Sequence, residues 1–181
     1  MRMRVGIIGS CGSGKSYIAR KLSIKYHIPY IETDNLVWDR EEANKRYPED
    51  VRDAKLKDIV NKAEWIIEGV HHKWGHESFT EADLIFIIQP HPLVRDYRVL
   101  RRFVRTRLGW EQANYMQTLR NLYEMLVVWN RKFDKELMQE ILELSSRCQG
   151  ICVVVRSNRE IETAIERYLK QQALTGPTIF V

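Results

Sequence analysis

One eight-residue segment near the start of the sequence has the residue types and the spacing of a phosphate-binding loop. It reads Gly9-Ser10-Cys11-Gly12-Ser13-Gly14-Lys15-Ser16 and satisfies the pattern G-x-x-x-x-G-K-[ST]. Glycines tolerate the backbone angles of a tight loop, so successive N–H groups can point inward at phosphate oxygens. In this pattern Lys15 would neutralise the β- and γ-phosphates of a nucleoside triphosphate, and the Ser16 hydroxyl would hold Mg²⁺. The alternative is a glycine-rich turn that binds nothing.

The segments on either side of this loop are those that such a site requires. An apolar run, Val5–Ile8, precedes the loop, and Lys15–Tyr26 has the spacing of a helix. The first turn of a helix presents unpaired N–H groups and a partial positive charge, and both attract phosphate. Because motif and context agree, the sequence predicts a site for ATP or a similar nucleotide.

Further apolar runs predict the rest of a parallel sheet. They are rich in Val and Ile and mostly lack alternation, as strands do when helices cover both faces of a sheet. The runs are Tyr30–Thr33, Trp65–Glu68, Leu84–Ile88 and Ile151–Val155. Helical spacing at Lys15–Tyr26 and Val51–Ala63 gives the alternation of an α/β fold. Ser157 and Glu160 have the spacing of a capping box and predict a last helix that ends at about Gln171.

The long interval between Ile88 and Ile151 lacks a strand signal and predicts helices. An apolar stripe at helical spacing marks the first of them: Leu93, Tyr97, Leu100, Val104 and Leu108. Gly109 is expected to separate this helix from a second one, whose own stripe runs from Leu119 to Leu144.

Four arginines form a basic face opposite the first apolar stripe: Arg95, Arg98, Arg102 and Arg105. An exposed basic face is commonly only solvated. Here Asp96 is the only acid interleaved with the arginines, and phosphoryl transfer needs mobile positive charge to stabilise its transition state. We therefore predict that this face binds anions, with Arg98 and Arg102 as candidate catalytic residues.

Size and composition set limits on the class of protein. A chain of 181 residues with 44% hydrophobic content predicts one domain spanning residues 1–181. Three cysteines without a CxxC pair predict reduced thiols and a cytoplasmic location. No apolar run approaches the length that spans a membrane, so no membrane partner is expected. The net charge of +5 suits a phosphate-bearing ligand, nucleic acid, or no particular partner.

Two other classes of nucleotide-binding protein fit poorly. A GTPase needs the guanine-reading pattern N-K-x-D after a late strand. The nearest match, Asn61-Lys62-Ala63-Glu64, precedes the third predicted strand and ends in the wrong acid. A motor or helicase would usually be larger and carry an acidic pair at a strand end, where this chain has Glu68 alone.

Beyond the phosphate loop, three segments are informative in combination and order: I-P-Y-I-E-T-D-N-L-V-W (28–38), W-I-I-E-G-V (65–70) and R-V-L-R-R-F-V-R (98–105). With the loop, they resemble the small P-loop kinases of the nucleoside-monophosphate and shikimate kinase type. Among these, the chain looks like the adenylate-kinase-like proteins often labelled DNA topology modulation proteins. The resemblance covers nearly the whole chain. It implies a three-layer α/β/α P-loop fold, a five-stranded parallel sheet of order 2-3-1-4-5, and a mobile helical lid at about 91–115.

The resemblance also implies roles for residues outside the loop. Asp34 would face the acceptor and orient or deprotonate a hydroxyl, or reach Mg²⁺ through water, although it could instead be a turn residue or a helix N-cap. Glu68 would order the water shell of the metal, or else be a buried acid capped by backbone. Arg156 and Asn158 would lie where the family cradles adenine. Tyr17 stands where the family commonly has a threonine that helps hold the α-phosphate, so this contact differs.

The function predicted is transfer of the γ-phosphate of Mg-ATP to a small-molecule or nucleotide acceptor, by a monomer or homodimer. The alternative is a nucleotide-dependent DNA-binding regulator, for which the sequence has no recognisable groove-reading motif. Three histidines, His71, His72 and His76, could suggest zinc, but they lack a convincing fourth ligand. Contact with the acceptor, or plain exposure, is the favoured interpretation of these histidines.

Overall fold

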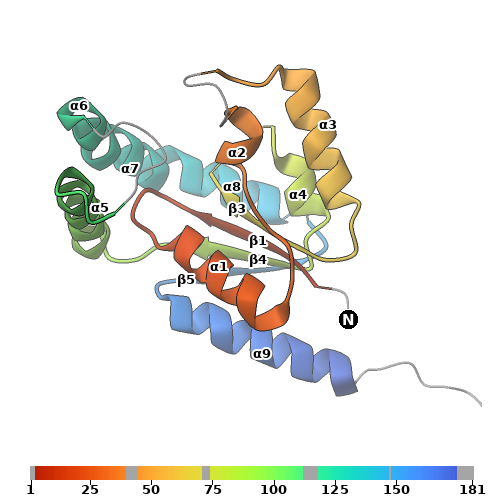
Figure 1. Cartoon of the computed structure of the whole chain (residues 1–181). Coiled ribbons are helices and arrows are strands. Elements are labelled where there is room, and N and C mark those ends of the chain that lie inside the picture. Colours follow the sequence, from red (N-terminus) through yellow and green to blue (C-terminus); the bar gives the residue numbers. More distant parts are fainter. Residues whose placement is uncertain (1–2, 40–44, 71–73, 112–117, 147, 175–181) are drawn as a thin grey trace, which may run out of the picture.

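A five-stranded sheet forms the centre of the molecule (Figure 1). The structure, a computed structural model, describes residues 3–39, 45–70, 74–111, 118–146 and 148–174. In spatial order the strands are β2 (Tyr30–Glu32), β3 (Trp65–Gly69), β1 (Arg4–Gly9), β4 (Leu84–Ile88) and β5 (Ile151–Val155). All neighbouring strands run parallel. The predicted strand order 2-3-1-4-5 is confirmed.

Helices cover both faces of this sheet, as the unalternating strands predict. One face packs against α1 (Lys15–Tyr26) and α9 (Asn158–Leu174), and the other against α3 (Glu49–Val60), α4 (His76–Thr80) and α8 (Met138–Ser146). Consecutive residues of β1 show the division, because Ile7 packs in the core with Ile18 of α1 whereas Ile8 packs in the core with Leu56 of α3. The three-layer α/β/α prediction is confirmed.

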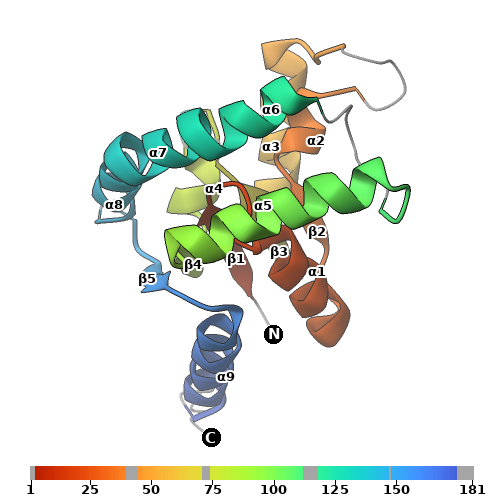
Figure 2. The ribbon, with the colours of Figure 1, turned by 90° about the vertical axis from the view of Figure 1, so that its left-hand side faces the viewer.

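The carboxyl ends of the strands meet the loop and two further helices. The phosphate loop joins β1 to α1, α2 (Asp34–Val37) follows β2, and α5 (Pro92–Arg107) follows β4. Figure 2 shows α5 crossing in front of the sheet, with the helical run from α6 to α8 beside it. Gly109 has φ 73°, in the left-handed region, and ends α5 as predicted.

The second long helix is not a uniform α-helix. It consists of α6 (Leu119–Tyr123), the π-helical turn η1 (Glu124–Trp129), α7 (Asn130–Lys132), the π-helical turn η2 (Phe133–Leu137) and α8. A π turn holds more residues than an α turn and so rotates the residues beyond it. The apolar stripe expected from a constant period is therefore broken: Phe133 and Ile141 are buried, whereas Leu119 and Trp129 are exposed.

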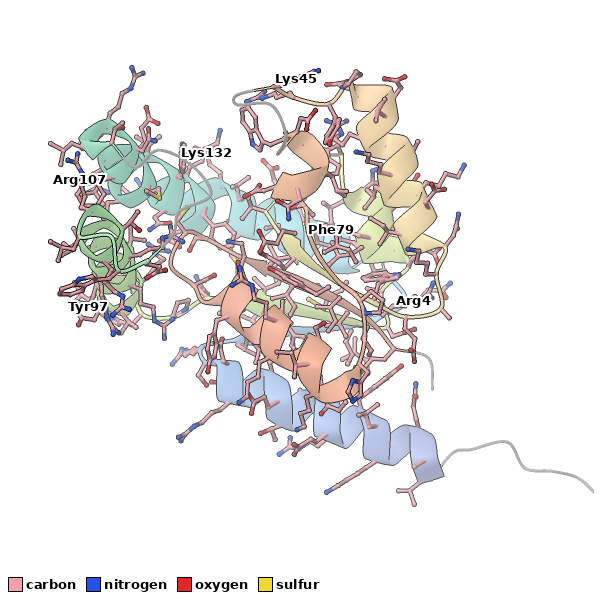
Figure 3. The ribbon with its side chains drawn as sticks, in the orientation of Figure 1. Arg4, Lys45, Phe79, Tyr97, Arg107 and Lys132 are labelled. Carbon is pink, nitrogen blue, oxygen red and sulfur yellow. The ribbon has the colours of Figure 1, made fainter. Side chains whose placement is uncertain are left out.

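The orientation of α5 is unusual for an amphipathic helix. Its apolar stripe lies on the outside of the molecule, and Tyr97 extends away from the body (Figure 3). The buried residues of the helix are Arg95 and Val99. Side chains on the basic face contact other parts of the protein, which the helical period alone does not reveal.

The three cysteines are all free, as predicted. In the part of the chain that the structure describes, no helix combines the length and the apolar character needed to cross a bilayer.

Candidate active site

The phosphate loop depends on two glycines with left-handed backbone angles. Gly12 has φ 77° and Gly14 has φ 96°, a region that other residues enter at a cost. Gly12 is also confined by α5, since a Cβ atom there would lie 2.5 Å from the carbonyl oxygen of Arg95 and 2.8 Å from Cγ2 of Val99. The glycine therefore allows both the turn and the close approach of a helix.

The other loop residues are largely enclosed. Ser10 and Ser13 are buried, and the Ser13 hydroxyl is a buried polar atom without a hydrogen-bond partner. A Cβ atom at Gly9 would lie 2.5 Å from Oγ of Ser13, which explains the first glycine. Burial raises the pKa of the Cys11 thiol, against the opposing charges of Lys15 and Arg102. Cys11 is thus kept as a neutral thiol, consistent with a role for its backbone only.

Lys15 and Ser16 converge on Glu68 at the end of β3. The Ser16 hydroxyl donates to Oε1 of Glu68 at 2.6 Å, and Nζ of Lys15 lies 3.9 Å from Oε2 of Glu68. The Glu68 side chain is 4% exposed. Burial raises its pKa, while Lys15 and the Ser16 hydroxyl lower it. The carboxylate is therefore held by these two side chains.

This arrangement suits a divalent cation. Oε2 of Glu68 is buried and accepts no hydrogen bond, with the Lys15 ammonium 3.9 Å away, and burying a carboxylate oxygen without a hydrogen bond is costly. A hydroxyl oxygen and a carboxylate oxygen are hard donors, and Mg²⁺ usually takes only one or two protein carboxylates, with water and phosphate completing its shell. The described residues contain no group of three or more His, Cys, Asp or Glu side chains placed to hold a metal ion.

Two residues beside Glu68 were missed by the sequence reasoning. The Tyr30 hydroxyl donates to Oε1 of Glu32 and lies 3.3 Å from Oε1 of Glu68, and Arg20 donates to Glu32 at 3.1 Å. Glu32 and Glu68 are register partners on β2 and β3. Burial, followed by the bond to Glu32, raises the pKa of Tyr30. Aligning the ends of the two strands in the predicted sheet would have placed the two acids side by side.

Asp34 lies in the first turn of α2, and Thr33 is the N-cap residue. Asp34 is therefore not the N-cap that was one alternative. It is exposed, and its negative charge helps raise the pKa of both Cys11 and Glu68. Asp34 thus belongs to the same electrostatic environment as the loop.

The arginines of α5 have different surroundings. Nη1 of Arg98 donates to the carbonyl oxygen of Ser13 at 3.0 Å. Arg102 lies 3.6 Å from the sulfur of Met125, and its charge lowers the pKa of Cys11. Arg98 thus contacts the loop directly, whereas Arg102 contacts η1 and acts on the loop through its charge.

Arg95 instead is a buried structural cation. Its side chain is 4% exposed and forms two bonds to Asp134, at 2.8 and 2.9 Å. It also donates to the Ser10 hydroxyl at 3.2 Å. Arg105 pairs with Glu111 at 3.3 Å. The basic face predicted as one unit therefore serves several purposes.

The remaining predicted residues lie around the loop. Asn158 begins α9, and its Nδ2 atom would be 3.3 Å from a Cβ atom on Gly14. Arg156 follows β5, is exposed, and donates its backbone N–H to Glu160 at 3.2 Å, and the Ser157 hydroxyl donates to the same carboxylate. Tyr17 is exposed on α1. His71 and His72 lie outside the described residues, and His76 is exposed at the start of α4.

Comparisons with known proteins identify solved structures of the same architecture. No protein-family model matches the sequence, and no curated protein matches it. A shikimate kinase from Aquifex aeolicus has a TM-score of 0.54 and 20% identity, over 96% of this chain and 100% of that chain. A gluconokinase from Sinorhizobium meliloti 1021 has a TM-score of 0.50 and 15% identity, over 97% of this chain and 98% of that chain. An uncharacterized protein from Eubacterium ventriosum ATCC 27560 has a TM-score of 0.54 and 16% identity, over 94% of this chain and 99% of that chain.

At these identities the likeness concerns the fold. The resemblance to adenylate-kinase-like or topology modulation proteins is not confirmed, since the named neighbours are a shikimate kinase and a gluconokinase. The DNA-regulator alternative gains no support from them. The chain therefore has the α/β fold shared by P-loop kinases.

Proposed function

We propose that this chain is an ATP- and Mg²⁺-dependent phosphotransferase that acts on a small hydroxylated acceptor. One observation carries the proposal: the phosphate loop with Lys15 and the arginines of α5 face each other, with Arg98 only 3.0 Å from the loop carbonyl of Ser13. Nucleotide binding alone requires only the lysine of the loop. Phosphoryl transfer requires further cations, supplied by a second element, to stabilise the transition state.

The residues of the loop would bind and neutralise the triphosphate. The N–H groups of 9–16 and the ammonium of Lys15 would hold the phosphates, with Asn158 and Arg156 beside the adenosine and Tyr17 at the start of α1. Ser16 and Glu68 would hold Mg²⁺, which supplies charge neutralisation when bound. Lys15 would leave Glu68 for the phosphates on nucleotide binding.

Transfer would then proceed by direct displacement. The acceptor hydroxyl oxygen forms a bond to the γ-phosphorus, the bond from that phosphorus to the β–γ bridging oxygen breaks, and ADP departs. Asp34 orients the hydroxyl and takes its proton. Arg98 and Arg102 stabilise the charge on the transferred group, and closure of a lid at about 91–115 excludes water.

The competing DNA-binding function is weakened by the orientation of α5. Arg95 is buried in an ion pair and Arg98 donates to the loop, so two of the four arginines of the basic face already have partners within the chain. A protein that binds DNA through several phosphates would need those guanidinium groups for the phosphates.

An acceptor panel tests the proposal. Release of ADP from Mg-ATP would be measured with nucleoside monophosphates, shikimate, gluconate and related polyols. Lys15→Ala should lower turnover at least about 100-fold, because it removes a cation from the transferring phosphates. Lys21→Ala is the matched control, because Lys21 lies on the same helix in an exposed ion pair with Glu162. Acceptor-dependent turnover that survives Lys15→Ala, or no binding of ATP at millimolar concentration, would contradict the proposal.

A further inference from the structure

The proposed mechanism leaves three polar side chains beside Glu68 without a role. They are Arg20 on α1 and the residues Tyr30 and Glu32 on β2. The Tyr30 hydroxyl donates to Oε1 of Glu32 and makes a longer contact, 3.3 Å, with Oε1 of Glu68. Arg20 in turn donates to Oε1 of Glu32 at 3.1 Å. These contacts connect a guanidinium on α1 to the carboxylate that we assign to the metal.

The secondary structure places all of these groups on one face of the sheet. Tyr30 and Glu32 are two residues apart on a strand, so their side chains point to the same face. Glu68 is the register partner of Glu32 and lies on that face too. Helix α1 packs against this face. Its residues Ser16 and Arg20 are four apart and therefore neighbours on the helix surface, and each donates to one of the two acids.

Two acids side by side on paired strands repel each other unless donors or cations lie close to them. The side chains of Glu32 and Glu68 are 15% and 4% exposed, so water screens this repulsion only weakly. Arg20 compensates the charge of Glu32, and Lys15 lies 3.9 Å from Glu68. The phenol of Tyr30 contacts both acids and supplies one proton without adding a charge. Tyr30 thus helps the two acids to lie next to each other.

The contacts distinguish the two oxygens of the Glu68 carboxylate. Oε1 is approached by two hydroxyls, Ser16 at 2.6 Å and Tyr30 at 3.3 Å. Oε2 accepts no hydrogen bond within the described part of the chain. The carboxylate is therefore held through one oxygen and keeps the other for a cation or its water. The Ser16 hydroxyl uses its proton on Glu68, so its lone pairs are likewise available to a cation.

We propose that Tyr30 is a positioning residue for the metal site. Its hydroxyl, held by Glu32 and through it by Arg20, fixes the rotation of the Glu68 carboxylate and so keeps Oε2 available to Mg²⁺. The inference rests on the proposed phosphotransferase function, because it assigns Tyr30 to the cation of that same site. The alternative is a bracket that only ties α1 to β2, which would affect stability and leave cation binding unchanged.

Calorimetry tests this role without turnover. The affinity of the full chain for a non-hydrolysable ATP analogue is measured in Mg²⁺ and again in EDTA. The Kd in EDTA divided by the Kd in Mg²⁺ gives the contribution of the cation. Tyr30→Phe should lower this ratio about tenfold, because loss of a group that orients a metal ligand typically costs about 10–100-fold in metal affinity. The affinity in EDTA should stay nearly the same, since the substitution keeps the ring and changes no charge.

Tyr168→Phe is the matched control. Tyr168 packs against the same core, and its hydroxyl accepts a hydrogen bond from Gln172 at 2.6 Å. It lines a cavity with Ile151, the first residue of β5, and so lies toward the end of the sheet opposite the phosphate loop. This variant removes a bonded phenol hydroxyl away from the metal site and should leave the ratio unchanged. Circular dichroism and urea unfolding check that both variants fold.

A double-mutant cycle tests whether Tyr30 acts through Glu68. Glu68→Gln should itself remove most of the contribution of the cation. If Tyr30 acts by orienting this carboxylate, adding Tyr30→Phe to Glu68→Gln should lower the ratio less than about twofold further. Independent roles would instead give fold-losses that multiply.

The outcomes separate this inference from the function on which it rests. An unchanged ratio in folded Tyr30→Phe, equal losses in Tyr30→Phe and Tyr168→Phe, or losses that multiply in the cycle would overturn the role of Tyr30 and leave the phosphotransferase in place. A wild-type chain that does not bind the analogue, or binds it equally in Mg²⁺ and in EDTA, would contradict both the proposed function and this inference.

Discussion

The phosphate loop and α5 lie against each other, yet they are specified in different ways. Within the loop, the order of glycines, lysine and serine sets the backbone path, because the groups involved are neighbours in sequence. In α5 the helix itself was predicted, but the sequence pattern did not specify its rotation about its own axis. The rotation of α5 is fixed by the partners of Arg95, which are far away in sequence. Ser10 is 85 residues before Arg95, and Asp134 is 39 residues after it.

The difference shows what an amphipathic pattern can specify. A period of 3.6 residues identifies two faces of a helix, and burial of the apolar face is then only the commonest outcome. A bidentate pair between a guanidinium and a carboxylate can be enclosed when its hydrogen bonds are made. Here Arg95 is enclosed between the loop and η2, and the apolar face is turned outward.

The largest effect on this contact is expected from Gly12→Ala. The alanine would have to keep the backbone φ of 77°, and its Cβ atom would lie 2.5 Å from the carbonyl oxygen of Arg95. Strain of the left-handed residue and overpacking together should lower the free energy of unfolding by about 3 kcal/mol. Urea unfolding measures the loss.

Gly109→Ala is the matched control for this substitution. Gly109 has a φ of 73°, but no atom lies within 4 Å of the position of its Cβ. Gly109→Ala should lower the free energy of unfolding by about 1 kcal/mol, from backbone strain alone. Equal losses for the two variants would show that the contact between the loop and α5 is not tight.

The second comparison uses the two faces of α5. Arg98→Ala should lower kcat/KM for phosphotransfer about 100-fold, corresponding to about 2.7 kcal/mol of transition-state stabilisation. Arg101→Ala removes the same group three residues along and should change kcat/KM less than about threefold, because Arg101 lies on the outside. Steady-state kinetics with the acceptor identified by the panel measures both variants. Similar losses for both would mean that net charge, rather than placement, is what matters.

The same contrast between local patterns and contacts distant in sequence explains which parts of the site could be predicted. The loop, the five parallel strands and their order could be predicted, because they depend on local patterns and on a family resemblance. The cluster of Tyr30, Glu32 and Glu68 could not be assembled from a local motif, since it depends on the pairing of β2 with β3. The partner of Arg95 could not be predicted from the sequence for a further reason. Asp134 lies within a π-helical turn, where a constant helical period gives the wrong direction for a side chain.

The smallest effect is expected from Asp134→Asn, which removes one charge and keeps the shape. Arg95 would retain the Ser10 hydroxyl but lose its bidentate carboxylate. Breaking a fully buried pair costs about 3–5 kcal/mol. Because Asp134 is 31% exposed, we expect a smaller loss of about 1–2 kcal/mol in the free energy of unfolding. Glu162→Gln, which breaks the more exposed pair with Lys21, is the control and should cost less than about 0.5 kcal/mol.

A second measurement on Asp134→Asn separates two roles of the pair. If Arg95 only holds α5 in place, the folded Asp134→Asn variant should bind ATP as tightly as the folded Glu162→Gln control, as measured by calorimetry. If Arg95 also positions the loop through Ser10, affinity for ATP should fall several-fold while the loop sequence is unchanged. We expect the second result, because the guanidinium of Arg95 contacts both Asp134 and Ser10, and the backbone carbonyl oxygen of Arg95 lies close to Gly12. Unchanged affinity would restrict the Arg95 pair to a structural role and leave the geometry of the loop to its own sequence.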